Sequence, residues 1–192
     1  RQFASNQNSP LGALIPAAWA VVLSAATGSD DVIFGLTVSG RPADLPSAAR
    51  TVGSFINNVP LRLRLPDTRS LCSWLSVVQD QQLTLQEFEH NSPAQIKEWT
   101  GVRPYDALFD SLVVVQNSAT LVGPGGVTMS FAHGRLQTAY PISVEAAPTA
   151  DDLTLTLTYD RAKITAVLDE QLAAALPRVL LVTCHHFAVA GG

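Results

Sequence analysis

Charge is scarce in this sequence. Only 15% of the 192 residues are Asp, Glu, Lys or Arg, whereas 47% are apolar. Soluble domains usually carry about 25% charged residues, so we expect another domain or chain to cover part of the surface. The formal net charge of -4 gives no electrostatic reason to expect binding to a nucleic-acid backbone. Nucleic acid is therefore not an expected partner.

Cysteines are few, and no apolar run is long. Cys72 and Cys184 are the two cysteines, which are too few for a disulfide framework or a zinc site and fit a reducing, cytoplasmic setting. Residues 1–9 are polar, so no signal peptide is predicted. No apolar run reaches the ~20 residues of a membrane span, and no phosphate-binding loop or dinucleotide motif is present. We expect no membrane partner, no metal and no bound nucleotide.

The chain does contain helical and strand patterns in alternation. Helices are predicted to begin at Ser9-Pro10, at Ser70, at Ser92-Pro93 and near residue 165 or 166. Alternating or continuous apolar residues predict strands at 32–38, 59–65, 108–116, 129–131, 135–145 and 153–159. The run at 108–116 is typical of a central strand, and Pro60 indicates the start of a strand or an edge strand. Together they predict an α/β or α+β layered domain, a mixed β-sheet flanked by helices.

Two residues define the expected limits of the first helix. Pro16 lies inside its apolar pattern and removes a backbone donor, so we expect it to bend or shorten the helix. Gly28 follows the last apolar position and is predicted to end the helix.

Three separated stretches carry a resemblance to a known family. Residues 27–35 read Thr-Gly-Ser-Asp-Asp-Val-Ile-Phe-Gly and lead into Val-Ser-Gly-Arg-Pro at 38–42. Residues 53–62 read Gly-Ser-Phe-Ile-Asn-Asn-Val-Pro-Leu-Arg, and residues 108–114 read Leu-Phe-Asp-Ser-Leu-Val-Val, followed by Thr-Ala-Tyr-Pro-Ile at 138–142. In order and spacing these stretches resemble condensation domains of nonribosomal peptide synthetases.

That resemblance implies one lobe of a two-lobed enzyme. Each lobe of such a domain resembles chloramphenicol acetyltransferase, and a tunnel runs between the two. Carrier proteins bring an acyl or peptidyl donor and an aminoacyl acceptor on phosphopantetheine arms, so no cofactor is bound directly. A His-His-x-x-x-Asp-Gly motif on the N-terminal lobe lies at the reaction centre. Residues 1–192 are expected to form a single C-terminal lobe, without the catalytic N-terminal lobe, which is then an expected partner alongside peptidyl carrier domains.

The resemblance also assigns roles to three residues. Arg62 matches the motif arginine that pairs with the aspartate of the catalytic motif across the lobe interface, although strand alternation alone would make it a solvated arginine. Asn57 matches the motif asparagine near the tunnel, but turn chemistry is an equal alternative. Arg41 either contacts the tunnel or interface or simply belongs to a turn. Asn58 departs from the motif, which has threonine at that position. No catalytic residue is predicted within this chain.

Residues 185–191, near the C-terminal end of this chain, imitate the catalytic motif that the family carries on its N-terminal lobe. They read His-His-Phe-Ala-Val-Ala-Gly, with Ala190 in place of the aspartate. Because a helix follows the strand at 153–159, we expect His185 and His186 to close that helix, where histidines suit the helix dipole. The alternative is that Pro177 breaks the helix and releases residues 179–184 as a strand.

Three hypotheses about function follow. The first is a lobe of a peptide-forming condensation domain that is inactive by itself. The second is a non-catalytic module that docks carrier proteins or tailoring enzymes. The third is an epimerisation-type sister domain. All three share a fold, and a preceding lobe with an intact His-His-x-x-x-Asp-Gly motif would separate the first from the second.

Overall fold

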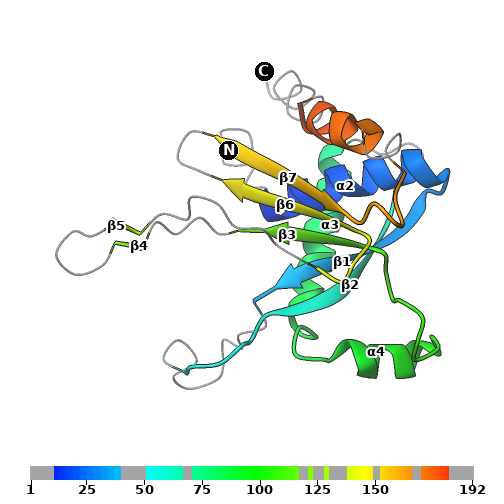
Figure 1. Cartoon of the computed structure of the whole chain (residues 1–192), viewed down its shortest axis with the longest axis vertical. Helices are drawn as coiled ribbons and strands as arrows, with labels where there is room; N and C mark the ends of the chain where they lie inside the picture. Colours follow the sequence, from blue (N-terminus) through cyan, green and yellow to red (C-terminus); the bar gives the residue numbers. More distant parts are fainter. Residues whose placement is uncertain are drawn as a thin grey trace.

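Five strands form one mixed β-sheet. Residues 11–39, 51–66, 71–116, 121–122, 128–129, 138–148, 152–165 and 170–181 are the part of the chain that the computed structural model describes. The sheet has the order β2-β1-β3-β6-β7 (Figure 1), with β2 at Asn57–Arg64, β1 at Asp31–Val38, β3 at Ser111–Val115, β6 at Ile142–Pro148 and β7 at Leu153–Tyr159. The inner strands β1, β3 and β6 are parallel, and the two outer strands are antiparallel to their neighbours. The short strands β4 (Leu121–Val122) and β5 (Thr128–Met129) pair separately.

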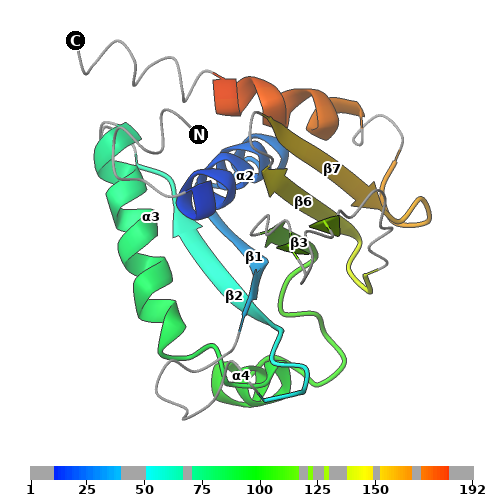
Figure 2. The same cartoon turned by 90° about the vertical axis from the view of Figure 1, so that its left-hand side faces the viewer.

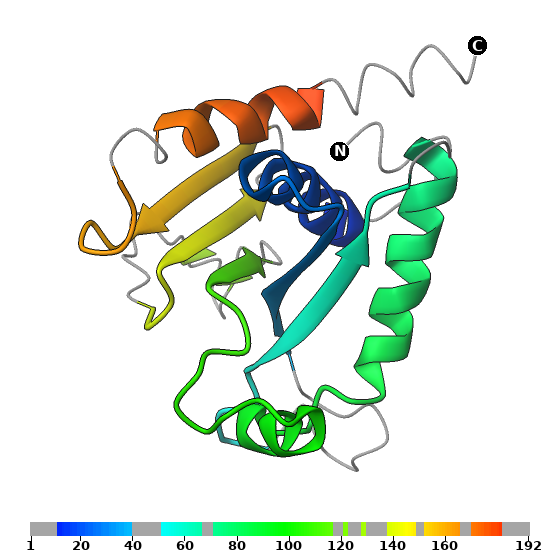
Figure 3. The same ribbon diagram turned by 90° about the vertical axis from the view of Figure 1, so that its right-hand side faces the viewer.

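Three helices pack against one side of the sheet. These are α2 (Leu11–Thr27), α3 (Leu71–Gln86) and a helix at residues 170–181. Their buried apolar residues join those of the strands in one hydrophobic core, and Figures 2 and 3 show the three helices around the sheet. The fourth helix, α4 (Pro93–Thr100), lies apart from them at the bottom of each view and buries none of its residues. The mixed sheet flanked by helices is thus confirmed.

Helix α2 continues through Pro16, so the predicted shortening is wrong. Proline at position 16 leaves the carbonyl of Gly12 without its intrahelical donor. Gln82 of α3 supplies that donor, because its Nε2 lies 2.8 Å from the carbonyl oxygen of Gly12. Pro16 itself is fully buried, so burial in the core favours keeping the helix whole. Gly28 ends it as predicted, with a φ of 70° and an N–H that donates to the carbonyl of Ser24.

Most predicted strands are found, with shifted ends. β7 matches the alternation at 153–159, β3 is the middle strand of the sheet, and β2 is an edge strand, as Pro60 indicated. The strand predicted at 135–145 was placed too early, because β6 begins at Ile142 after a segment in which 138–141 are not strand. Ser70, Phe131 and residues 135–137 lie outside the described residues. The last helix runs past Pro177 to residue 181, so the break predicted in the alternative is wrong.

A glycine in β1 makes room for an aromatic ring. Gly35 lies on the opposite face of the strand from Phe34, and the ring of Phe109 packs directly on its backbone. A Cβ atom at Gly35 would lie 2.2 Å from Cε2 of Phe109. That ring is buried at 4% exposure and stacks on Tyr140 with centroids 5.0 Å apart, so it has little freedom to move away.

Gly35→Ala is therefore expected to lower the free energy of unfolding by about 1–3 kcal/mol, the usual cost of overpacking a core. Denaturant unfolding followed by circular dichroism measures the change. Gly12→Ala is the matched control, since a Cβ there meets nothing within 4 Å, and it should cause no loss. Equal stabilities of the two variants would contradict the contact.

Candidate functional site

The predicted site residue Arg62 lies on the exposed side of the edge strand β2. Leu61 and Leu63 are buried at 3% and 1% exposure, and alternation places Arg62 and Arg64 on the other side. Their side chains are 69% and 76% exposed. The structure therefore places Arg62 where it can contact a partner.

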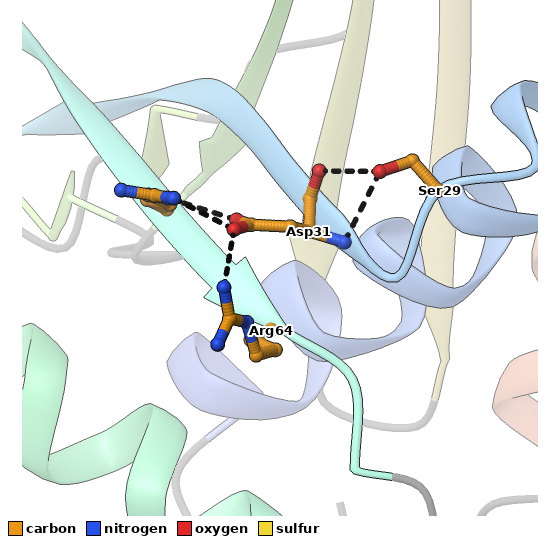
Figure 4. A network of polar contacts seen from close by, with 4 residues as sticks. Ser29, Asp31 and Arg64 are labelled. Carbon is orange, nitrogen blue, oxygen red and sulfur yellow. Dashed lines mark hydrogen bonds and ion pairs between the residues drawn. The ribbon is translucent and has the colours of Figure 1, made fainter.

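Asp31, at the start of β1, holds both arginines. Nε and Nη2 of Arg62 donate to its two carboxylate oxygens at 2.8 and 2.7 Å, a bidentate pair, and Nη2 of Arg64 donates at 3.1 Å. Figure 4 shows the side chain of Arg64 directed at the carboxylate of Asp31. Arg64 lies directly opposite Asp31 in the β1–β2 register. We call these three residues the Asp31 cluster.

The backbone of Asp31 is tied to the preceding turn. Ser29 Oγ donates to the carbonyl of Asp31 at 2.9 Å, and the N–H of Asp31 donates back to that hydroxyl at 3.3 Å (Figure 4). Gly28 ends α2 just before this turn. The turn at the end of α2 thus fixes the backbone position of Asp31 at the start of β1.

The charges in the cluster stabilise one another. Hydrogen bonds from Arg62, and next from Arg64, lower the pKa of Asp31 from 3.8 to about 2. The hydrogen bond to Asp31 raises the pKa of Arg62 in turn. Asp31 and Arg62 are therefore both charged near neutral pH. With two cations and one anion, the cluster presents a net positive charge on a chain of net charge -4.

Arg62→Gln is expected to raise the pKa of Asp31 from about 2 toward 3.8, because it removes the largest stabilising contact of the carboxylate. A depressed folded-state pKa adds stability that is present above pH 3.8 and is lost as the pH falls toward 2, so the variant should also lose less stability in that window. Carboxyl-carbon NMR titration measures the pKa. Arg103→Gln, which removes a similar exposed arginine paired with Asp106, should leave Asp31 unchanged. An unshifted Asp31 in Arg62→Gln would contradict the pairing.

Asn57 joins the start of β2 to the segment between α3 and α4. Its Nδ2 donates to the carbonyls of Glu89 and Asn91 at 2.8 and 2.7 Å, and its Oδ1 accepts from the N–H of Asn58. Asn58 in turn accepts from Thr37 Oγ1 at 2.8 Å across the β1–β2 ladder. The amide of Asn57 thus fixes the position of a distant segment, and its tunnel role stays a prediction.

A groove that was not predicted lies at the carboxyl ends of β1 and β3. It has a volume of about 570 Å³ and runs between these strand ends and α3. In open α/β sheets this edge is a common place for ligands. Amide side chains on its walls can donate and accept hydrogen bonds but cannot serve as acid or base; they are Gln79, Gln82, Gln86 and Gln116. The helical spacing of the three glutamines in α3 was the signal that sequence reasoning missed.

Several predicted residues lie outside the described part of the chain. These are Arg41, His185 and His186, and their predicted roles stay predictions. Within the described ranges, no group of three His, Cys, Asp or Glu residues could hold a metal ion. In the same ranges, no helix has the length and apolar character needed to cross a membrane.

The sequence matches condensation domains over nearly its full length. The family model described as "Condensation domain" matches residues 1–187. A linear gramicidin synthase of Brevibacillus parabrevis is 33% identical over 181 residues, which cover 93% of this chain and 4% of that protein. Chondramide synthase cmdD of Chondromyces crocatus is 36% identical over 141 residues, which cover 72% of this chain and 4% of that protein. The chain thus spans a small fraction of these relatives.

Solved structures share the fold. The condensation domain of the monacolin K polyketide synthase MokA superposes with a TM-score of 0.79 at 18% identity, covering 96% of this chain and 44% of that one. The first condensation domain of the calcium-dependent antibiotic synthetase gives a TM-score of 0.73 at 19% identity, covering 97% of this chain and 41% of that one. These likenesses confirm the predicted fold, which resembles that of chloramphenicol acetyltransferase.

Proposed function

Because this chain belongs to the condensation-domain family, we propose that it is the C-terminal lobe of a nonribosomal peptide synthetase condensation domain. The observation that carries the proposal is a match along nearly the whole chain to less than half of each solved domain. The motif at 53–62, which resembles the family's second-lobe motif, favours the C-terminal half. Residues 1–192 then form one lobe, and the other lobe is its first partner.

The proposed reaction joins two carrier-bound substrates. The amine of an aminoacyl acceptor attacks the carbonyl of an acyl or peptidyl thioester. A C–N bond forms and the C–S bond breaks, while a base accepts a proton from the amine. The donor's phosphopantetheine sulfur leaves as a thiolate and then takes up that proton to become the free thiol. Both substrates arrive on peptidyl carrier domains, so the lobe needs no cofactor of its own. We place the base on the other lobe, in the family's histidine motif.

In this proposal the chain supplies surface and positioning groups. Arg62 extends from β2 to the aspartate of the catalytic motif on the other lobe, and the exposure of its side chain supports that reach. Asn57 keeps the strand that carries Arg62 joined to the segment before α4. Arg41, from the Ser-Gly-Arg-Pro stretch, is proposed to line the tunnel or the lobe interface.

One observation favours the alternative of a docking module. Helix α4 exposes Trp99 at 65%, and Tyr105 beyond it is fully exposed. Exposed aromatic side chains are typical anchors of protein interfaces. A non-catalytic module that recruits carrier proteins or tailoring enzymes would use such a surface and keep the same fold. An intact His-His-x-x-x-Asp-Gly motif on the preceding lobe would favour an enzyme, of the condensation or the epimerisation type, over a docking module.

Arg62→Ala in the intact two-lobed domain is expected to reduce amide formation or loosen the packing of the lobes, because it leaves the facing carboxylate without its partner. Mass spectrometry of products released from loaded carriers measures the rate, and differential scanning calorimetry measures the melting temperature. Arg103→Ala, which removes another exposed, ion-paired arginine, is the control. Unchanged rate and melting temperature in Arg62→Ala would refute the lobe-facing role.

A further inference from the structure

Arg62 has donors that Asp31 does not use. A guanidinium carries five N–H donors in a rigid plane. Asp31 accepts from Nε and from one hydrogen of Nη2. One hydrogen of Nη1 and the second hydrogen of Nη2 form another edge with the same spacing as the first. Among the described residues, Asp31 is the partner of Arg62, and it occupies the first edge.

We propose that Asp31 is a positioning residue, which clamps one edge of Arg62 so that the other edge, together with Arg64, receives a carboxylate from a facing protein surface. The inference deepens the proposed function, since the facing surface is then the other lobe of the domain. It adds two residues, Asp31 and Arg64, to the single motif arginine.

The chemistry of the cluster selects a carboxylate. A planar guanidinium edge binds the two oxygens of a carboxylate through parallel hydrogen bonds, which a single amide or hydroxyl cannot match. The cluster keeps a net positive charge after Asp31 is counted, so a second anion is still attracted. Arg64 extends the positive surface, since Asp31 engages only its Nη2 and its side chain is 76% exposed.

Preorganisation is the benefit that Asp31 provides. A free arginine side chain samples many rotamers, and fixing one on binding carries an entropic cost. The bidentate contact at 2.8 and 2.7 Å already fixes the plane of the guanidinium. The ion pair is not needed to hold the strands together, because β1 and β2 are paired over eight successive positions from Asp31↔Arg64 to Val38↔Asn57.

The test compares single replacements with a charge swap in the intact two-lobed domain. Asp31→Asn keeps the size of the side chain but weakens the clamp, and it should slow amide formation roughly tenfold, since small misplacements of a positioning group have large kinetic effects. Arg62→Lys keeps the charge but removes the second edge and should slow the reaction to a similar extent. The combined swap Asp31→Arg with Arg62→Asp restores an ion pair between the strands but presents the wrong charge outward, so it should not recover activity.

The Arg103–Asp106 pair gives the matched control. It is an exposed arginine–aspartate pair at 2.7 Å on the segment after α4. Asp106→Asn and the swap Arg103→Asp with Asp106→Arg should leave the rate unchanged. Melting temperatures should stay close to wild type in the Arg103–Asp106 series, because that pair is exposed.

A second readout does not depend on catalysis. The Nε–H of Arg62 should exchange slowly with solvent in the wild-type chain and rapidly in Asp31→Asn, as measured by ¹⁵N NMR. If Asp31→Asn formed amide at the wild-type rate, or if the swap recovered full activity, the inference would be overturned while the proposed function stayed intact. Fast exchange of the Arg62 Nε–H in the wild type would also overturn it. A third outcome separates the two ideas. If exchange is slow and depends on Asp31 but the wild-type two-lobed domain makes no amide, the positioning role is supported and the proposed function is refuted.

Discussion

Trp19→Ala is expected to lower the free energy of unfolding by about 3–5 kcal/mol, the range for removing a large buried aromatic side chain. Trp19 is fully buried in α2, between the helices and the sheet. Its Nε1 donates to Ser111 Oγ of β3 at 3.2 Å. The variant therefore loses packing and also leaves a buried hydroxyl without its partner. Chemical denaturation followed by circular dichroism measures the loss.

Two further variants separate these contributions. Trp19→Phe keeps most of the volume but leaves the hydroxyl of Ser111 unsatisfied, which costs about 1–3 kcal/mol. Adding Ser111→Ala should recover part of that loss, since both polar partners are then gone. Trp99→Ala is the matched control, because that side chain is 65% exposed on α4, and its effect should be small. Equal losses for Trp19→Ala and Trp99→Ala would contradict the described core.

Local sequence patterns correctly predicted those helices and strands whose form depends on residues close by in the sequence. The alternating leucines and threonines of β7 predicted a strand. Ser92 and Pro93 predicted the start of α4, where the structure has a complete capping box between Ser92 and Gln95. Gly28 predicted the end of α2 because its positive φ suits glycine. In each case the signal lies within a few residues of the feature.

Features that depend on distant residues were not predicted. The continuation of α2 through Pro16 depends on Gln82, which is 70 residues from Gly12 along the chain. Likewise, the burial of Gly35 depends on Phe109, which reaches it from a later segment. The helix propensities of the residues in α2 do not include a hydrogen-bond donor that α3 supplies. Such contacts become visible only once the order of the strands and helices in space is known.

The candidate site shows the same division. Alternation along β2 placed Arg62 on an exposed face, and the motif resemblance drew attention to it. Asp31 lies within a resembling stretch, but the sequence assigns it no role, because its contact with Arg62 and Arg64 follows from the antiparallel register of β1 and β2. The contacts of Asn57 with Glu89 and Asn91 are equally hidden in the sequence, since they join a strand to a loop more than 30 residues later.

The isolated chain is expected to form no peptide bond. Condensation requires the amine to be held against the thioester, and that positioning supplies much of the rate. In the proposed domain the substrates meet between two lobes, and the proton acceptor belongs to the other lobe. The groove of this chain, within the described residues, is lined largely by apolar and amide side chains, with Glu89 as its ionisable member. The expected effect is therefore loss of all product, not a reduced rate.

Product analysis with loaded carrier proteins tests the central claim most directly. The purified chain is mixed with a donor-loaded and an acceptor-loaded carrier protein, with and without the preceding lobe, and dipeptidyl product is measured by mass spectrometry. The half-domain account predicts no product above the carrier-only background from the chain alone, and product once the other lobe is added. Product from the chain alone that disappears in His186→Ala would contradict that account and would place the catalytic histidine in this chain.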